Sequence, residues 1–331
     1  MNDKVYDTFL NTIDSRALVN TGDRVLLALS GGSDSVVMLH LFLRLASERD
    51  ITLEAAHINH MIRPTAGRDE QFCKELCEKY AVRLHIRRID VPALSRVRKV
   101  GLEECGRDVR YEAFSQIMKE RGLNICATAH NKNDNAETLV LNFVRGASAR
   151  GLSGMRPSEP ASGSSPARVR PLLRVRHAAL ADWLRAEGLA WREDSTNAAD
   201  DADRNRIRHR VLPAVLDAFG PAFLSTLSRS MDLLRDDADL LDALAAAPGA
   251  TEGPSQHSAF SIPHSPPLLR RRIAAALYAA GVDPEAVTLD AIERIRRLVA
   301  AHRGGAVPLG GGVSARVRKG EILVERDAAG R

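Results

Sequence analysis

Cysteines, aromatic residues and long apolar runs are all scarce in this sequence. Its 331 residues include four cysteines, and no two of them have the CxxC spacing of zinc sites, iron–sulfur clusters and sulfur carriers. No stretch approaches the roughly 18 uninterrupted apolar residues that a membrane-spanning helix requires, and the first residues lack a basic segment followed by an apolar one. We therefore expect a cytoplasmic protein that depends neither on a structural metal nor on disulfides.

Lysine is also rare, so the positive charge comes almost entirely from arginine. Lys and Arg total 47 against 42 Asp and Glu, a formal charge of +5, yet only seven of the 47 are lysines. Genome composition is one explanation. A polyanionic partner is the other, because the guanidinium fork pairs bidentately with phosphate. Since aromatics make up only 4% of the chain, we expect backbone and shape contacts rather than base stacking to dominate any RNA contact.

The remaining composition is typical of a globular protein. Hydrophobic residues make up 44% and charged residues 27% of the chain, which excludes chain-wide disorder, and the length allows two domains. In the first half, β-rich runs alternate with helical patterns. We expect strands over 24–29, 53–58, 84–89 and 123–129, and helices over 34–45, 69–80, 102–120 and 133–144. This order predicts an α/β fold with a doubly wound, mainly parallel sheet.

The second half predicts a different architecture. A Pro-, Ser- and Gly-rich segment over 156–168 indicates a flexible surface loop, either an active-site flap or a tolerated insertion. Helical patterns then follow over 177–187, 204–219, 221–244, 267–280 and 288–302, with a linker at 247–254 and a terminal β-hairpin over 313–326. We therefore expect a catalytic α/β domain over 1–215 and a smaller, mainly helical C-terminal domain over 216–331.

The strongest motif lies between the first predicted strand and the first predicted helix. Its glycines let backbone amides approach an anion, its hydroxyls add donors, and the helix N-terminus adds partial positive charge. A carboxylate within it would repel phosphate unless it holds a Mg²⁺ ion that bridges the phosphates. The alternative is a simple helix-capping turn. The residues of this motif are Ser30, Gly31, Gly32, Ser33, Asp34 and Ser35.

The sequence SGGSDS after a strand resembles the PP-loop ATP pyrophosphatase superfamily and differs from a Walker A loop, since no Gly-Lys-Ser/Thr occurs in the chain. The resemblance implies an adenine nucleotide alpha hydrolase-like fold and an ATP that is split between its α and β phosphates. Pyrophosphate then leaves and the substrate is adenylated. The proposed Mg²⁺ would be held by Asp34.

Further segments make the chain similar to the tRNA(Ile)-lysidine synthetase family over residues 20–215. They are HINHMIR at 57–63, EECGRDVRY at 103–111, AHNKNDNAET at 129–138, RPLL at 170–173, EDSTN at 193–197 and RNRIRH at 204–209. The rest of the chain is similar to the short form of that family, which has a small tRNA-contacting C-terminal domain.

This resemblance implies a carbon–nitrogen ligase that works in two steps. The 2-carbonyl oxygen of the wobble cytidine in a CAU-anticodon tRNA(Ile) attacks the α-phosphorus of ATP, and pyrophosphate departs. The ε-amino group of free L-lysine then displaces AMP to give lysidine, which changes codon reading from Met to Ile.

Asp134 and Glu137 are the leading catalytic candidates. They lie three residues apart at a predicted helix start, so both carboxylates share a face and could seat the lysine ammonium and accept its proton. The alternative is a helix cap with a first-turn acid. A position at a strand end in an open α/β sheet favours the functional interpretation. His130, just before them, would orient substrate or donate to the developing phosphate charge; a structural role is its alternative.

Arginines complete the predicted site. Arg63 and Arg110 end their motifs and would neutralise phosphates or grip the cytidine, unless they are solvated surface charges. A basic group at a helix start would contact the tRNA or close the active site, with an exposed basic helix face as its alternative. This group contains Arg204, Asn205, Arg208 and His209.

Other functions stay open at this point. A tRNA thiolase shares the adenylating chemistry but uses cysteine pairs, and NAD and GMP synthetases share the phosphate loop. A catalytically silent nucleotide-sensing or RNA-binding module is a third class, disfavoured by the presence of Asp34, Asp134 and Glu137 together. The sequence does not fix the oligomeric state, and a homodimer is one alternative.

Overall fold

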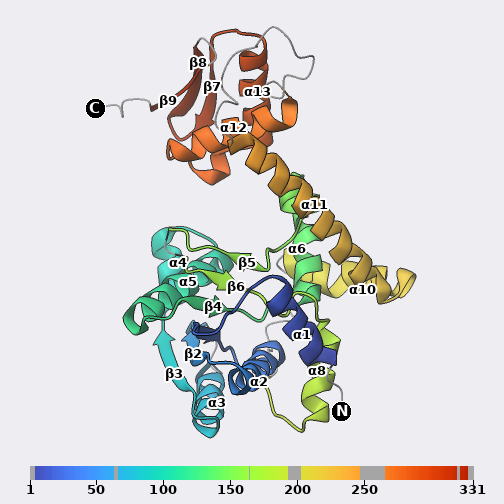
Figure 1. Ribbon diagram of the computed structural model, residues 1–331. Helices are drawn as coiled ribbons and strands as arrows, with labels where there is room; N and C mark the ends of the chain where they lie inside the picture. The colour runs from blue at the N-terminus through green and yellow to red at the C-terminus, as the bar shows by residue number, and fades with distance from the viewer. Residues whose placement is uncertain are drawn as a thin grey trace. The chain divides into compact units, whose positions relative to one another are not determined.

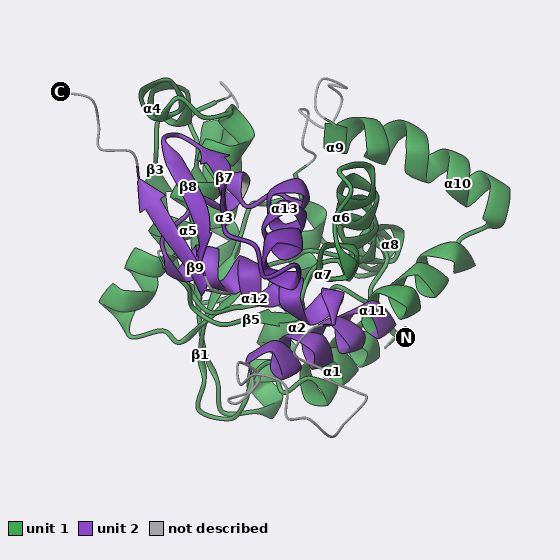
Figure 2. Cartoon of the chain, turned by 90° about the horizontal axis from the view of Figure 1, so that it is seen from above, with its two compact units in different colours: residues 1–232 green, residues 233–331 purple. Residues whose placement is uncertain are grey.

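The computed structural model describes residues 4–62, 66–163, 165–192, 203–246, 265–318 and 321–326. The chain forms two compact units, Met1–Asp232 and Leu233–Arg331, coloured separately in Figure 2. Each unit has its own hydrophobic core.

A six-stranded sheet with the order β3-β2-β1-β4-β6-β5 forms the centre of the first unit (Figure 1). Five strands pair in parallel and β5 pairs antiparallel with β6 at the edge. This confirms the predicted mainly parallel sheet. All four predicted strands are present, the fourth much shorter than expected. The strands are β1 (Arg24–Ala28), β2 (Thr52–Asn59), β3 (Arg83–Arg88), β4 (Ile125–Ala127), β5 (Ser158–Glu159) and β6 (Arg168–Val169).

The continuous apolar run in β1 reflects burial on both faces of the sheet. Val25 and Leu27 belong to one large core cluster, whereas Leu26 belongs to another on the opposite face. Successive strand side chains point to opposite faces, so a strand covered by helices on both sides needs apolar residues throughout. The first cluster is lined mainly by α1 (Lys4–Ser15), α2 (Ser33–Glu48), α3 (Ala66–Lys79) and α8 (His177–Ala186), and the second by α5 (Leu102–Arg121).

The order of the sheet places two loops side by side. β1 pairs with β2 on one side and with β4 on the other. The chain therefore continues from β1 through β2 and β3 on one side, and then crosses to add β4 on the other side of β1. Such a switch point opens a crevice at the carboxyl ends of the strands. The loops after β1 and β4 meet there, followed by α2 and by α6 (Lys132–Val144).

The segment expected as a flexible loop contains regular structure. Within 156–168, Ser158 and Glu159 form β5, and Glu159 forms ion pairs with Arg168 and Arg170. Residue 164 lies outside the described residues. The described part of this segment therefore extends the edge of the sheet. Two short helices, α4 (Val91–Arg98) and α7 (Ala149–Leu152), were not predicted.

A helical layer follows the sheet and packs on α6. Ala136 of α6, Ile207, Leu212 and Leu224 share one apolar cluster. This packing keeps the helices after residue 203, including the first turns of α11, in the first unit, so the compact units divide inside α11. The functional boundary at 215/216 stays a prediction. The layer comprises α9 (Asp203–Arg206), the π-helix η2 (Ile207–Val211), α10 (Leu212–Phe219) and α11 (Ala222–Ala246).

The second unit ends in a three-stranded antiparallel sheet, whose last two strands confirm the predicted hairpin over 313–326 and whose first strand was not predicted. β7 (Gly305–Gly310) precedes β8 (Val313–Arg318) and β9 (Glu321–Arg326), in the order β7-β8-β9. β7 was not predicted because it contains Pro308 and begins and ends with glycine, and both residue types are depleted in strands. Helices α12 (Pro266–Ala279) and α13 (Leu289–Ala300) and the short η4 (Pro284–Ala286) complete this unit. The predicted linker at 247–254 lies outside the described residues.

Within the described residues, no single helix is long and apolar enough to cross a membrane. Asp203–Phe219 and Ala222–Ala246 pass that test only as a pair, bent by 106°.

Phe42 allows a test of the core. Its side chain is fully buried on α2 and contacts Phe9 edge-on, with 5.2 Å between ring centroids. Phe42→Ala is expected to lower the free energy of unfolding by about 3–5 kcal/mol, because it removes the ring and leaves a cavity. Phe143→Ala, at a ring that is 70% exposed, should change it by less than about 0.5 kcal/mol. Urea denaturation of both variants measures the difference; equal effects would contradict this core assignment.

Candidate active site

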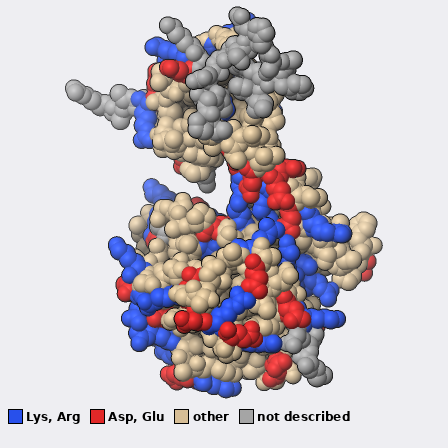
Figure 3. Space-filling view, viewed as in Figure 1, with Lys and Arg blue, Asp and Glu red and all other residues tan. Residues whose placement is uncertain are grey.

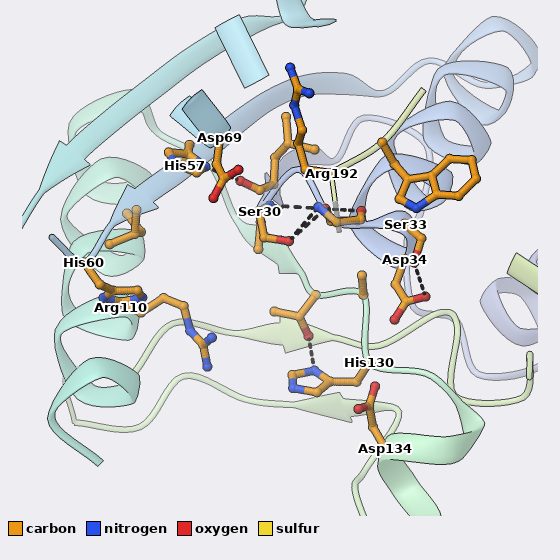
Figure 4. A pocket seen from close by; sticks show the side chains of 18 of the residues that line it. Ser30, Ser33, Asp34, His57, His60, Asp69, Arg110, His130, Asp134 and Arg192 are labelled. Atoms are coloured by element: carbon orange, nitrogen blue, oxygen red, sulfur yellow. Dashed lines mark hydrogen bonds between the residues drawn. The ribbon is translucent and has the colours of Figure 1, made fainter. Parts of the chain in front are cut away.

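A cavity of about 1340 Å³ opens at the carboxyl ends of β1, β2 and β4. Its walls come from the loop after β1, the end of β2, the loop after β4, and faces of α5, α6 and α8. Figure 4 shows Asp34 and Asp134 facing this space from the first turns of α2 and α6, with Arg110 on the opposite wall. The predicted phosphate loop and the predicted acid pair therefore line one cavity.

The phosphate loop is held together from inside by Ser35. Its buried hydroxyl accepts hydrogen bonds from the backbone N–H groups of Ser30 and Gly31, both at 3.2 Å, and donates to the Gly32 carbonyl at 2.9 Å. Gly32 supplies no side-chain cap to α2. The first amides of α2 are therefore not used by a capping side chain, and such amides bind anions.

Gly31 adopts a backbone conformation that favours glycine. Its φ of +89° lies in the left-handed region, and a Cβ atom there would lie 3.4 Å from both Phe72 Cδ1 and Cys73 Sγ. The Gly31 carbonyl also accepts a hydrogen bond from the backbone N–H of Arg192 at 2.9 Å. Glycine permits this backbone conformation without strain.

Both carboxylate oxygens of Asp34 are engaged. Asn131 Nδ2 donates to Oδ2 at 2.9 Å, and His177 Nδ1 lies 2.8 Å from Oδ1. The hydrogen bond to Asp34 raises the pKa of His177 against the opposing effect of burial. Neither partner was predicted from the sequence. Asn131 lay within a motif that had been singled out, whereas His177 carried no signal beyond the start of a helix.

The acid pair is neutralised by two arginines. Arg204 Nε lies 2.9 Å from Glu137 Oε2, and Arg208 Nε lies 2.7 Å from Glu137 Oε1. The same arginines reach Asp134 Oδ1 through their Nη2 atoms, at 3.4 and 3.1 Å. Glu137 is 2% exposed, so these contacts supply the pairing that a buried carboxylate needs. Two side chains expected to contact tRNA therefore lie against the acids expected to bind lysine.

His130 lies in an environment that disfavours its charged form. Its Nδ1 is 3.0 Å from Thr128 Oγ1. Burial, followed by the nearby guanidinium groups of Arg170 and Arg110, lowers its pKa well below the ordinary value. His130 is therefore neutral at pH 7 and can donate or accept a hydrogen bond, but it brings no positive charge to a phosphate.

The other predicted residues fall into three groups. Arg110 and Asn205 line the cavity, and no acidic side chain among the described residues forms an ion pair with Arg110. His209 is exposed and is not part of the cavity lining. Arg63 lies outside the described residues.

Comparisons with known proteins identify the family of this chain. A family model for the PP-loop domain matches residues 1–215. The tRNA(Ile)-lysidine synthase of Chlorobaculum tepidum is 33% identical over 321 residues, which cover 94% of this chain and 93% of that protein. The chain belongs to the tRNA(Ile)-lysidine synthase family.

Other tRNA(Ile)-lysidine synthases match a shorter part of their own length. The Clostridium acetobutylicum protein is 33% identical over 71% of this chain and 50% of its own length. The Geobacter sulfurreducens protein is 37% identical over 84% of this chain and 59% of its own length. The chain thus spans about half the length of some curated relatives it matches and nearly all of another.

A solved structure outside the lysidine synthase family shares the fold. The U34-tRNA thiolase NcsA from Methanococcus maripaludis, with its [4Fe-4S] cluster, superposes with a TM-score of 0.59 at 17% identity. The match covers 70% of this chain and 79% of the thiolase. It supports the same adenine nucleotide alpha hydrolase-like sheet in this lysidine synthase family member.

The contact between Asp34 and His177 leads us to expect a raised pKa of the His177 ring that can be measured. Because the pKa of His177 is raised in the folded protein, the stabilisation by this pair is complete below the ordinary histidine pKa of about 6.5. It is lost as the pH rises through the raised value. Asp34→Asn removes the negative charge, so the His177 pKa should fall. NMR titration of the His177 ring in both proteins, with a chelator present, provides the measurement; an unchanged pKa would show that Asp34 does not cause the shift.

Proposed function

We propose that this protein is a tRNA(Ile)-lysidine synthetase. In this proposal it uses ATP to adenylate the wobble cytidine of a CAU-anticodon tRNA(Ile) and then joins L-lysine to the activated base. AMP and pyrophosphate are released, and a new carbon–nitrogen bond forms. One observation carries the proposal: the phosphate loop and the acid pair line one cavity, and Asn131 links Asp34 to the start of the helix that bears the acids.

ATP binding is proposed at the loop of Ser30 to Ser35. The amides at the start of α2 would hold the phosphates that leave as pyrophosphate. Mg²⁺ fits this site, because it uses one or two carboxylates together with phosphate oxygens, and Asp34 offers a carboxylate to the cavity beside those amides. When bound, the ion neutralises the charge that develops on the leaving pyrophosphate.

Lysine activation is proposed at the acid pair. The ε-amine must lose a proton before it attacks, which requires a base near the reacting carbon. Burial raises the pKa of Asp134, so this carboxylate is our candidate for the acceptor. Arg204 and Arg208 hold both acids in place, and we assign these arginines to positioning the pair rather than to the tRNA backbone.

The cytidine would enter beside Arg110 and His130. Arg110 lines the cavity away from the acid pair (Figure 4), where a guanidinium can hydrogen-bond a base edge or a phosphate. Neutral His130 and the amide of Asn205 add uncharged hydrogen-bonding groups in or beside the same cavity. Uncharged donors and acceptors suit recognition of a base edge extruded from its stack.

The arginines on the rest of the surface differ in whether they form ion pairs with acidic side chains. On the face of the first unit in Figure 3, basic side chains are interspersed with acidic ones. In the second unit, Arg270, Arg271 and Arg316 pair with acids. Arg297, Arg303 and Arg318 are exposed and form no ion pair with described residues. We propose that these three contribute more to phosphate contacts with tRNA than the paired arginines do.

Sulfur transfer is the main alternative, because the thiolase fold is similar. All four cysteines of this chain are buried. Burial raises the pKa of Cys77 to about 11 and that of Cys126 to about 12, whereas a reactive thiol needs a lowered pKa and access to its partner. The cysteines therefore favour the lysidine reaction over sulfur transfer.

Incubation with ATP, labelled L-lysine and a CAU-anticodon tRNA(Ile) transcript tests the function directly. We expect label to enter the RNA only when ATP is present. A transcript with uridine in place of the wobble cytidine is the matched control and should remain unlabelled. Failure to label the cytidine transcript, together with sulfur or ammonia transfer to another substrate, would refute the proposal.

Asp34→Ala tests the proposed role of the loop carboxylate. It should abolish ATP-dependent adenylation, measured as pyrophosphate release with tRNA present and lysine omitted, because the developing phosphate charge loses its metal ligand. Asp34→Asn, which keeps the shape of the side chain, should behave in the same way. Loss of the lysine step alone, with normal pyrophosphate release, would contradict the metal role.

A further inference from the structure

Asn131 lies at the junction of the two halves of the proposed site. It is 2% exposed and is the N-cap residue of α6. Its side chain has one acceptor oxygen and one donor NH₂ group; the oxygen contacts the start of α6 and the NH₂ group contacts Asp34 at the start of α2. Among the described residues, Asn131 makes the only direct hydrogen bond between Asp34 and the start of α6. An indirect link runs through His177, whose ring contacts Asp34 and whose backbone N–H donates to Asn133 Oδ1 at 3.1 Å.

The oxygen of Asn131 organises the start of α6. Asn131 Oδ1 accepts hydrogen bonds from the backbone N–H groups of Asn133 at 2.7 Å and Asp134 at 3.1 Å. In return, Asp134 Oδ2 accepts from the Asn131 backbone N–H at 2.9 Å, which completes a capping box. One carboxylate oxygen of Asp134 is thus fixed by Asn131, and the other faces Arg204 and Arg208.

The amide nitrogen of Asn131 reaches the other loop. Asn131 Nδ2 donates to Asp34 Oδ2 at 2.9 Å, across 97 residues of sequence. The remaining oxygen of Asp34 contacts His177. A single rigid amide group therefore connects the carboxylate of the ATP half-site to a carboxylate of the lysine half-site.

We infer that Asn131 is a positioning residue that sets the spacing between the ATP and lysine half-sites, and this inference rests on the proposed function. Each half-site also has its own supports, because Asp34 keeps His177 and the acid pair keeps Arg204 and Arg208. Loss of the Asn131 bridge should therefore leave binding of each substrate largely intact. It should misalign the groups that act between them, and misalignment of about 1 Å can cost up to about a hundredfold in rate.

Two substitutions separate the bridge from the helix cap. Serine and aspartate are both good N-cap residues, so Asn131→Ser and Asn131→Asp keep an acceptor for the start of α6. Serine has no donor that reaches Asp34. Aspartate has the size of asparagine but turns a carboxylate, rather than an NH₂ group, toward Asp34. Asp90→Ala is the matched control, because it removes the N-cap of α4, a residue that does not line the cavity.

For Asn131→Ser we expect a melting temperature within about 2 °C of the parent protein, since the cap is kept. We expect kcat for lysidine formation to fall by about tenfold or more, while KM for ATP and for lysine changes by less than about threefold. Asn131→Asp should lower kcat at least as far. ATP binding measured with a chelator present should be unchanged in the serine variant, and Asp90→Ala should melt earlier at an unchanged kcat.

The results distinguish failure of the inference from failure of the function. If the parent protein makes no lysidine, the proposed function is wrong. If the parent protein is active and Asn131→Ser retains its kcat, the bridge does not set the spacing. A serine variant that melts earlier and regains full kcat at lower temperature would show that Asn131 acts only through the stability of the fold. Either of the last two results overturns the inference.

Discussion

β1 and β4 run parallel and pair directly, with Val25 opposite Ile125 and Leu27 opposite Ala127. The loops that follow these strands must therefore leave the sheet at the same edge, next to each other. One loop carries the glycine–serine turn and leads into α2 with Asp34, and the other carries His130 and leads into α6 with the acid pair. The cavity, the bridge through Asn131 and the chemistry proposed for the site all depend on this pairing. Burial of β1 on both faces anchors it, because Leu26 and Leu27 pack into separate cores.

In the cavity, acidic side chains are paired with basic ones, so no single sign of charge dominates. Glu137 is buried and would be costly without a partner, and two guanidinium groups provide that partner together with Asp134. Asp34 is similarly matched by His177, whereas burial, together with neighbouring arginines, lowers the pKa of His130 and keeps it neutral. Such an arrangement suits a reaction that must bind a polyanion and also produce an uncharged amine. The acids on α6 and the amides proposed to bind phosphate at the start of α2 share one cavity.

Local patterns predicted the central sheet because each of its signals lies within a short stretch of chain. The apolar run at 24–29 and the helical periodicity at 34–45 appear as β1 and α2. Strands that are defined by their partners in another segment of the chain were not predicted. β7 contains Pro308 and is defined as a strand by its pairing with β8. β5 is stabilised by Arg168 and Arg170, which the sequence places in a later segment.

The sequence by itself determined the phosphate loop, the family resemblance and the acid pair, because side-chain identity and spacing within a few residues are sufficient for each. Only the tertiary structure decided what these groups contact. Arg204 and Arg208 resembled an exposed basic helix start, and the fold turns them toward Glu137. Asn131 lay within the 129–138 motif without a predicted partner and His177 carried no signal, and the fold brings both to Asp34. A hydrogen bond between residues 97 positions apart depends on strand order and helix packing, which no local pattern specifies.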